Sequence, residues 1–505
     1  MSARLALFLL AVFFTISALS IRHSTETADE RWHYQYGVNV LAGDSTRFDD
    51  SKMPFSALNA VPAKLAEGLG DGALKTALES LNAARWMTIL FAVLTGGLVY
   101  RLAAELYGPR GGLLALFLFA FDPNLIAYGS LVTTDMYISG MALAAMYTFW
   151  KFLNAPSWKT GVLAALALGL AQLAKYTGIF LYPICLLVWL AHSPPKSLKG
   201  AAKAGLVMAG FAAASILIIN LGFLWNRVGV PLAEYPFRSE IFQGAQTALE
   251  GQAAWRVPLA FPYLEGLDWV VENERHSVTF GRIYLFGQLR ESGFMGYYLY
   301  AALVKVPLAT LVIIGYAFWR RKFVKPEIFL LIPVLFFTVY FNFFYNAQIG
   351  FRYYLVIFPL LYVFCGRAVR MNRRALTGLA VWLALSVLSY FPHYIPYYNE
   401  IVLDRRDGYK FLADSNSDWG QAKWYLAEWL DAHPEAVYEP ETIAPGTLVV
   451  SVNHLTGVTG IPERWAWLRE GFEPDGTIAY SYLIYHLSPE RCEARGKCVA
   501  PETAP

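Results

Sequence analysis

The sequence has few charged residues for its length. Only 16% of its 505 residues are Asp, Glu, Lys or Arg, whereas an ordinary soluble domain carries about a quarter. The basic residues form short clusters between apolar segments, without the interleaved aromatic residues typical of a nucleic-acid-binding surface. The chain also lacks internal repeats and low-complexity regions. This shortage of charge, together with 56% hydrophobic residues, predicts a protein that crosses a membrane several times.

Cysteine is scarce as well, and the four cysteines are of two kinds. Cys185 and Cys365 lie inside apolar runs and are expected to be small core residues. Cys492 and Cys498 lie in the polar tail "CEARGKC". They predict a small disulfide loop if this tail faces an oxidising compartment, and two free thiols are the alternative.

Long apolar runs are abundant. A transmembrane helix takes about 20 residues, and eleven runs reach or approach this length. They predict an all-α polytopic membrane protein with about eleven transmembrane helices, several of them short and therefore tilted or broken. The runs are 4–21, 82–100, 112–127, 131–150, 160–174, 177–191, 204–224, 296–318, 327–345, 353–366 and 375–391.

The Lys and Arg residues in the short connections predict the orientation. If Arg4 is inside, the basic loops all fall on one side of the membrane, which is then the cytoplasmic side. The run 160–191 has basic residues at both ends, so it should cross twice, with its outer turn at "LAKYTG". We favour an uncleaved first span, although "SALS" before Ile21 is also compatible with a cleaved signal peptide.

An odd number of spans places the C-terminus outside. We expect residues 1–391 to form the membrane domain and residues 392–505 to form a small extracytoplasmic α/β region. Two further segments are expected on the same periplasmic or extracellular side, namely 22–81 and 225–295. The protein is accordingly predicted to be a multi-pass protein of the cytoplasmic (inner) membrane.

An acidic pair follows the first apolar run, in "STETADERWHYQYGVNVLAGD". Carboxylates at the outer mouth of a helical bundle can act as general bases, and partial burial tunes their pKa. Asp29 and Glu30 are therefore candidate catalytic residues. The structural alternative is that they only cap a helix that opens at "ERWHYQYGVNVL", since Asp is a good N-cap residue.

Further ionisable residues are expected at the same depth. Asp135 lies at the outer end of a span, where a charge is costly and by default suggests function. Arg85, Lys175 and Arg352 stand at the outer ends of other spans, although the outer loops are otherwise poor in cations. A lipid-borne phosphate would explain them, because Arg chelates phosphate oxygens and Lys offers a point charge. The alternative is ion pairing within the membrane, for example between Asp135 and Lys175.

These residues resemble the motifs of a known superfamily across nearly the whole chain. The sequence is similar to the GT-C glycosyltransferases of the protein O-mannosyltransferase-like (glycosyltransferase family 39-like) superfamily. The C-terminal part is similar to a bacterial branch of this superfamily, whose members end in an outer "DSN-x-DWGQ" segment. One departure is Met53-Pro54-Phe55, where family members often carry Pro-Pro-Leu after the acidic pair. The motifs are "DE" at 29–30, "FAFDPNLIAYGSLVTTDM", "LAKYTGIFLYP", "YLFGQLRESGFMGYYLYAALVKVPL", "IGFRYYLVIFPLL" and "YFPHYIPYYNE…LADSNSDWGQ".

The resemblance implies inverting transfer of a sugar from a polyprenyl-phosphate donor to a protein hydroxyl, a lipid or a cell-envelope glycan. Asp29 would be the base, assisted by Glu30 and Asp135, and Arg352, Lys175 and Arg85 would bind the donor phosphate. This hypothesis requires Asp29 and Arg352 to converge in one cavity. A lipid-linked-sugar carrier or flippase is the alternative. The resemblance implies no definite cofactor, and a divalent cation is the one candidate.

The octet "DSNSDWGQ" at 414–421 has a structural and a functional interpretation. Asx and Ser residues close turns by bonding to their own backbone, so this turn is expected mainly to dock onto the membrane domain. Contact with the acceptor is the alternative, and a metal site has little support because no further ligand spacing accompanies it. The candidate docking or acceptor residues are Tyr176, Asp414, Asn416, Asp418, Trp419 and Gln421.

Overall fold

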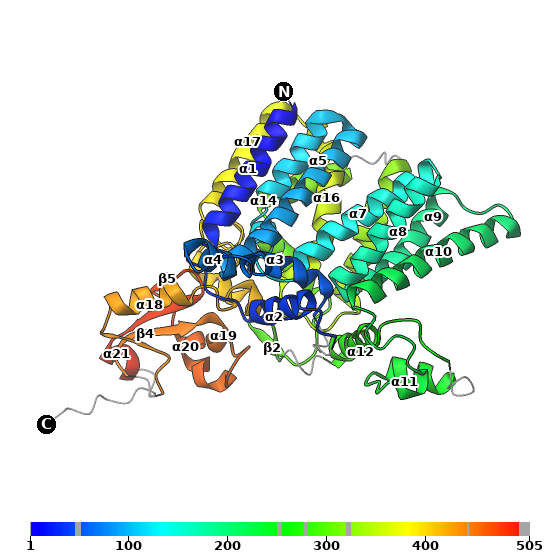
Figure 1. Ribbon diagram of the computed structural model, residues 1–505. Helices are drawn as coiled ribbons and strands as arrows, with labels where there is room; N and C mark the ends of the chain where they lie inside the picture. The colour runs from blue at the N-terminus through cyan, green and yellow to red at the C-terminus, as the bar shows by residue number, and fades with distance from the viewer. Residues whose placement is uncertain are drawn as a thin grey trace.

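The computed structural model shows a helical bundle with a polar region at one end (Figure 1). The N-terminus lies at the opposite end of the bundle from the C-terminal sheet. The structure describes residues 2–45, 52–249, 255–276, 281–319, 325–441 and 444–493.

The helices of the bundle coincide with the predicted apolar runs. Their lipid-facing sides carry exposed leucines such as Leu94, Leu206 and Leu335, as expected of helices that face hydrocarbon rather than water. The bundle consists of α1 (Ser2–Ser20), α5 (Leu81–Ala120), α7 (Asp135–Asn154), α8 (Trp158–Ala174), α9 (Leu181–His192), α10 (Leu198–Gly222), α13 (Tyr297–Lys305), α14 (Leu308–Trp319), α15 (Ile328–Phe343), α16 (Phe358–Cys365) and α17 (Arg373–Leu388).

The long element α5 is a hairpin of two helices. Its chain leaves helical geometry at Gly108, where φ is 80° and ψ is 170°, a left-handed conformation that glycine adopts without steric cost. A Cβ atom on Gly96 would stand 3.0 Å from the ring of Phe119, whereas a straight helix would separate these residues by about 35 Å. The runs 82–100 and 112–127 therefore lie side by side, as two crossings joined at this turn.

Five helices in the described part of the chain are long and apolar enough to cross a membrane, or six if the bent pair α13–α14 counts as one span. The count of eleven therefore stays a prediction, whereas a mostly helical, multi-span membrane protein is confirmed. Short helices account for part of the difference, because α8 and α9 have only 17 and 12 residues. The chain breaks between them at Lys175 and at the short 3-10 helix η2 (Tyr176–Phe180), where the sequence predicts the outer turn.

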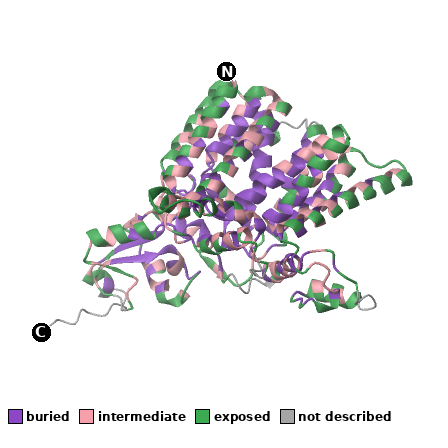
Figure 2. Ribbon diagram, in the orientation of Figure 1, coloured by how far each residue is buried: buried purple, intermediate pink, exposed green. Residues whose placement is uncertain are grey.

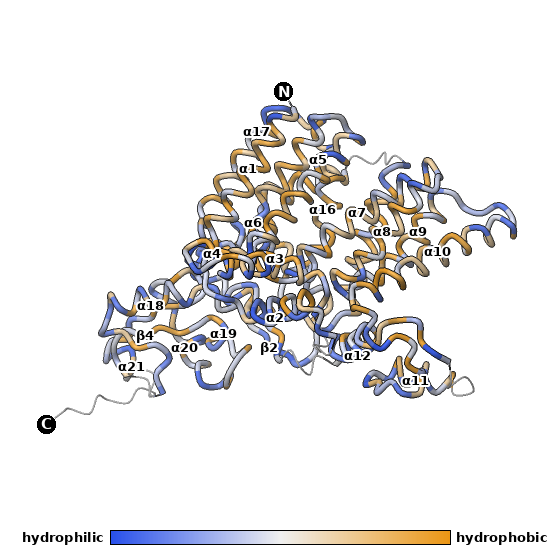
Figure 3. The backbone as a smooth tube through the Cα atoms, viewed as in Figure 1, coloured by the Kyte–Doolittle hydropathy of each residue, from blue (hydrophilic) through white to orange (hydrophobic). Residues whose placement is uncertain are grey.

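The polar segments gather at the end of the bundle away from the N-terminus. Figure 3 shows the change from apolar helices to more hydrophilic backbone at this end. The elements there come from all three segments that the sequence predicts to be exported. Those before the C-terminal region are α2 (Glu30–Leu41), η1 (Pro54–Ser56), α3 (Ala57–Ala66), α4 (Ala73–Glu79), α11 (Glu240–Ala248), α12 (Phe261–His276), β1 (Ile283–Leu285) and β2 (Gln288–Arg290).

The C-terminal region contains a four-stranded mixed sheet in the order β3-β4-β6-β5. The pair β3–β4 is parallel and the other two pairs are antiparallel. Apolar side chains on the two faces of this sheet belong to two separate clusters, so the sheet is covered on both sides. The elements are α18 (Lys423–Ala432), β3 (Ala436–Tyr438), β4 (Gly446–Ser451), α19 (Val452–Thr456), α20 (Ala466–Gly471), β5 (Gly476–Ile478), β6 (Tyr482–Leu487) and α21 (Pro489–Glu493).

The largest apolar core runs through the middle of the bundle (Figure 2). Every residue of α16 is buried, so this helix forms the centre around which the others pack. Cys185 and Cys365 are free and buried, as predicted. Cys492 is buried and disulfide-bonded. Its predicted partner Cys498 lies outside the described residues, so this pairing stays a prediction.

Candidate active site

Asp29 directly precedes α2, but its side chain does not cap that helix. It makes no side-chain capping hydrogen bond, and its Oδ2 instead accepts a hydrogen bond from Nη1 of Arg352 at 2.8 Å. The two residues lie 323 positions apart in the chain. Capping therefore does not explain this carboxylate, which faces a cation at the start of the 3-10 helix η6 (Phe351–Ile357).

Asp135 and Lys175 form a second ion pair beside the first. Asp135 is the first residue of α7 and is buried, and its Oδ1 lies 2.7 Å from Nζ of Lys175. The other oxygen of Asp135 lies 3.7 Å from Nη1 of Arg352. Asp135 thus connects the two cations. The ion pairing that the sequence leaves as an alternative is present, and it forms part of a larger charged cluster.

Aromatic rings hold the two cations in place. The guanidinium of Arg352 lies 4.0 Å from the ring centre of Trp419, and Nζ of Lys175 lies 4.1 Å from that of Tyr353. Cation–π contacts of this kind add attraction and restrict the positions of the charged groups. Nε of Arg352 is buried and has no hydrogen-bond partner within the described ranges. One donor of this guanidinium is therefore not used by the protein.

These charged groups line one cavity of about 150 Å³ at the polar end of the bundle. Its wall combines residues from α2, the start of α7, the turn before η2, the helix α12 and η6. The four predicted charged residues in this wall come from four separate parts of the chain, and the predicted residue Tyr176 directly follows Lys175. The lining residues are Asp29, His33, Lys52, Thr134, Asp135, Lys175, Tyr176, Thr177, Trp269, Val270, Glu274, Tyr345, Ile349, Arg352 and Tyr353.

Glu30 and Arg85 lie elsewhere. Both side chains are fully buried, and they form a two-pronged ion pair with N–O distances of 2.8 and 2.6 Å. The backbone amides of Thr27 and Val132 donate further hydrogen bonds to the Glu30 carboxylate. Neither residue lines the cavity. We therefore correct the sequence-based placement of Glu30 and Arg85 at the reactants, because each fully neutralises the other in the core.

The surroundings set the charge of the groups around Asp29. Burial acts to raise the pKa of the Asp29 carboxyl, but the nearby positive charges and the hydrogen bond from Arg352 together outweigh burial and hold this pKa below its usual value. Burial lowers the pKa of His33 to about 3. At neutral pH Asp29 is therefore an anion, and the neighbouring imidazole, whose Nδ1 lies 3.3 Å from Oγ of Ser56, is neutral.

The octet 414–421 packs against the membrane helices next to this cluster. Oγ of Ser415 donates to the backbone carbonyl of Ile349 at 2.7 Å, and the amide of Phe351 donates to Oδ1 of Asn416 at 2.9 Å. Both contacts flank Arg352. The docking interpretation accounts for these bonds, and it means that the octet also fixes the position of Arg352.

The remaining residues of the octet stabilise the turn itself. Gln421 accepts a hydrogen bond from the amide of Trp419 at 2.7 Å and donates to the carbonyl of Ser417 at 3.1 Å. Asp418 accepts from the amide of Gly420 at 3.0 Å. Asp414 has a left-handed φ of 59°, and burial raises the pKa of its carboxyl to about 7. No group of three or more His, Cys, Asp or Glu side chains suited to a metal ion is found within the described ranges.

An apolar space continues from the polar cavity toward the surface of the bundle. A neighbouring cavity of about 460 Å³ shares Tyr176, Thr177, Val270 and Glu274 with the polar cavity. It shares Tyr340 and Phe344 with a third cavity, of about 600 Å³. Apolar side chains of α9 and α15 line most of this third cavity. We call the second and third cavities together the apolar groove.

The sequence gives no signal for several residues of the polar cavity. His33, Lys52 and Trp269 stand in polar segments where such residues are ordinary. Glu274 is also unremarkable in the sequence, because α12 carries other acidic residues. These residues become recognisable only when the segments 22–81 and 225–295 fold over the same end of the bundle.

Comparison with known proteins gives a family match for part of the chain. Residues 73–222 match the family model described as dolichyl-phosphate-mannose-protein mannosyltransferase. This segment includes α5, α7, α8, α9 and α10, and therefore Asp135 and Lys175. Comparison with curated protein sequences gives no match.

Solved structures with a similar fold include ArnT from Cupriavidus metallidurans. The apo form aligns with a TM-score of 0.51 and 16% identity over 76% of this chain, and the alignment spans 62% of the ArnT chain. The form bound to undecaprenyl phosphate aligns with a TM-score of 0.51 and 13% identity, covering 95% of this chain and 97% of that one. Residues 73–222 thus match the protein mannosyltransferase family in sequence, and the chain as a whole has the fold of ArnT.

Proposed function

We propose that this protein transfers a sugar from a polyprenyl-phosphate-linked donor to an acceptor hydroxyl, with inversion, on the outer face of the cytoplasmic membrane. The observation that carries this proposal is the pairing of Asp29 with Arg352 at 2.8 Å in a cavity that Asp135 and Lys175 also line. The acceptor is a protein, a lipid or a cell-envelope glycan. The family match and the shared fold support the same class of reaction.

Asp29 is the proposed general base. It removes the proton of the acceptor hydroxyl while that oxygen attacks the anomeric carbon of the sugar. The new carbon–oxygen bond forms as the bond to the phosphate oxygen breaks, and the electron pair of the broken bond leaves with the polyprenyl phosphate. Base and leaving group stand on opposite faces of the sugar, so the configuration at the anomeric carbon inverts.

Arg352 and Lys175 are proposed to stabilise the leaving phosphate, which gains negative charge as the bond breaks. The unused Nε of Arg352 is a donor for a phosphate oxygen. A phosphate that draws Arg352 toward itself weakens the pair with Asp29, which makes Asp29 a stronger base. Asp135 contacts both cations and is therefore proposed to position them.

The apolar groove is the proposed site of the isoprenoid chain. It begins beside Glu274 in the wall of the polar cavity and continues between α9 and α15. A lipid-linked donor needs a polar site for the phosphate and an adjoining apolar path for the tail. The two spaces meet this requirement, and ArnT has been solved with undecaprenyl phosphate bound.

Asp29→Asn tests the proposed base. The amide cannot accept the proton, so the turnover rate with a purified undecaprenyl-phosphate sugar should fall by about 10²–10⁴-fold. Asp71→Asn is the matched control, because Asp71 is an exposed carboxylate whose partner is Lys75. Release of undecaprenyl phosphate and product formation are both measured. Full activity of the Asp29→Asn protein would exclude Asp29 as the base.

A carrier that moves lipid-linked sugar between leaflets is the second candidate function. A carrier would also need a charged cavity for the phosphate and an adjoining apolar groove for the lipid tail. Reconstituted vesicles distinguish the two functions. Movement of the donor between leaflets, without any glycosylated acceptor, would establish the carrier. Glycosylation of acceptor without such movement would establish the transferase.

A further inference from the structure

Glu274 stands where the polar cavity meets the apolar groove. It lies on α12, is half-buried, and lines both spaces. Its Oε2 accepts a hydrogen bond from the hydroxyl of Tyr340 at 2.6 Å, and Tyr340 itself lines the groove. The reaction proposed above gives Glu274 no role. Its position is nevertheless the point where the headgroup of a lipid-linked donor would join its tail.

Ionisable groups surround Glu274 on several elements. On its own helix, Arg275 is directed to Glu240 of α11, at 2.8 Å. The tyrosines around Glu274 are neutral at physiological pH, since a phenol ordinarily has a pKa of about 10. The charged group that acts most strongly on Glu274 is the cation Lys175. The surrounding groups are Lys175, Tyr298, Tyr340, Tyr345, Arg352 and Tyr353.

The charge of Glu274 decides the charge balance of the cavity. Among the described lining residues, Lys52, Lys175 and Arg352 are cations, and Asp29 and Asp135 are anions. His33 is neutral because burial lowers its pKa to about 3. A neutral Glu274 leaves one positive charge in excess, which complements an anionic phosphate. An ionised Glu274 removes this excess and places a carboxylate beside the phosphate.

We propose that Glu274 belongs to the donor site and binds the lipid-linked phosphate as a neutral acid, donating its carboxyl hydrogen to a phosphate oxygen. This inference rests on the proposed function, because it assumes that a polyprenyl phosphate occupies the cavity. Donor affinity then depends on the fraction of protein in which Glu274 is protonated, and it falls as that fraction falls.

The surroundings keep this acid partly protonated near neutral pH. Burial raises the pKa of Glu274 to about 7, although the hydrogen bond from Tyr340 and the positive charge of Lys175 oppose this effect. With this pKa, about half of the molecules carry the neutral acid at pH 7 and about one tenth at pH 8.

The test compares undecaprenyl phosphate binding by the full-length wild-type protein and the Glu274→Gln protein in lipid nanodiscs. Glutamine keeps a hydrogen-bond donor and does not ionise. The ratio of the two dissociation constants, wild type over Glu274→Gln, should rise about tenfold between pH 6 and pH 8. The ligand gains charge itself above pH ~6, but this change is common to both proteins and cancels in the ratio. Glu272→Gln, two residues away and outside the cavity lining, should retain the wild-type pH profile.

Tyr340→Phe provides a second, independent measurement. The substitution removes the hydrogen bond from Tyr340 to the Glu274 carboxylate, which favours the protonated form of Glu274. The midpoint of the pH dependence of undecaprenyl phosphate binding should therefore move to higher pH. If Glu274→Gln does not fold, this shift alone decides the inference. A constant ratio across pH, or an unmoved midpoint in Tyr340→Phe, would overturn the role of Glu274 while leaving donor binding intact. Failure of the wild-type protein to bind undecaprenyl phosphate at any pH would overturn both this inference and the lipid-linked donor.

Discussion

At the residue scale, two adjacent carboxylates at the start of α2 have different environments. Asp29 reaches the cavity and pairs with Arg352, whereas Glu30 turns into the core and pairs with Arg85. Consecutive side chains at a helix start point in different directions, so both cannot enter one cavity. The pair is thus divided between a candidate base and a buried ion pair that fixes the backbone beside it.

Glu30→Gln should destabilise the protein by about 3–5 kcal/mol, because removal of one partner leaves Arg85 as an uncompensated buried charge. Thermal unfolding in detergent measures this effect as a lower transition temperature. Glu67→Gln is the control, because Glu67 forms an exposed pair with Lys64 that contributes little. Equal stability of the Glu30→Gln and Glu67→Gln proteins would contradict the assigned role of the buried pair.

His33 should make the stability depend on pH in a defined window. Its pKa falls from 6.5 to about 3 in the folded protein, because the buried imidazole resists protonation. Between these values the unfolded chain binds more protons than the folded one, so stability rises with pH up to 6.5. His33→Asn removes this contribution, and its transition temperature should change less between pH 5 and pH 6.5 than that of the wild type. If the transition temperatures of the two proteins changed equally between pH 5 and pH 6.5, His33 would not be the source of this pH dependence.

At the scale of elements, the site depends on a turn from the C-terminal region that packs against η6. The octet surrounds Arg352 with contacts to Ile349 and Phe351, and Trp419 stacks on its guanidinium. Gly350 permits this approach, because a Cβ atom there would collide with the hydroxyl of Ser415. The turn and the 3-10 helix therefore form one unit, although more than sixty residues separate them.

Gly350→Ala should displace the octet and with it Arg352. Small misplacements of reacting groups can cost about 10²-fold in rate, so transfer activity should fall by about that factor while the bundle stays folded. Gly378→Ala in α17 is the matched control, because a Cβ atom there meets nothing within 4 Å. Transfer rates and limited proteolysis after Phe411 are compared for both proteins. Unchanged activity in Gly350→Ala would show that the octet does not position Arg352.

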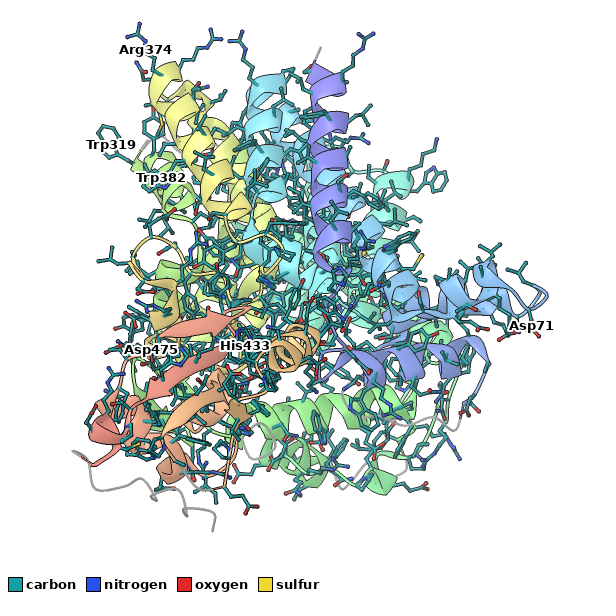
Figure 4. The ribbon with its side chains drawn as sticks, turned by 90° about the vertical axis from the view of Figure 1, so that its left-hand side faces the viewer. Asp71, Trp319, Arg374, Trp382, His433 and Asp475 are labelled. Atoms are coloured by element: carbon teal, nitrogen blue, oxygen red, sulfur yellow. The ribbon has the colours of Figure 1, made fainter. Side chains whose placement is uncertain are left out.

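At the scale of the whole molecule, all three predicted exported segments and the candidate site lie at one end of the bundle (Figure 1). Figure 4 shows Arg374 at the opposite end from Asp475 and His433. The proposed transfer reaction needs this separation, because its acceptor would approach from water at the level of the outer headgroups. The basic connections predict which end faces the cytoplasm.

Single cysteines at the two ends test this orientation. Asp475→Cys should react with a membrane-impermeant maleimide in cells whose cytoplasmic membrane is accessible but intact, and Arg374→Cys should react only after that membrane is permeabilised. Cys185 and Cys365 are buried and Cys492 is disulfide-bonded, and the protein without an introduced cysteine measures the background labelling. The reverse pattern would place the candidate site on the cytoplasmic side and exclude an extracytoplasmic reaction.

The sequence alone determined the membrane class, the positions of the apolar runs and the polar ends where ionisable residues stand out. These features are readable because a span needs about twenty apolar residues and a charge in it is costly. Only the tertiary structure decided which of these residues meet. It separated Asp29 from Glu30, brought Arg352 to Asp29 across 323 positions, and placed Glu274 at the mouth of the groove. Such contacts depend on how the helices pack and how the loops fold over them, and a local sequence pattern does not predict this packing.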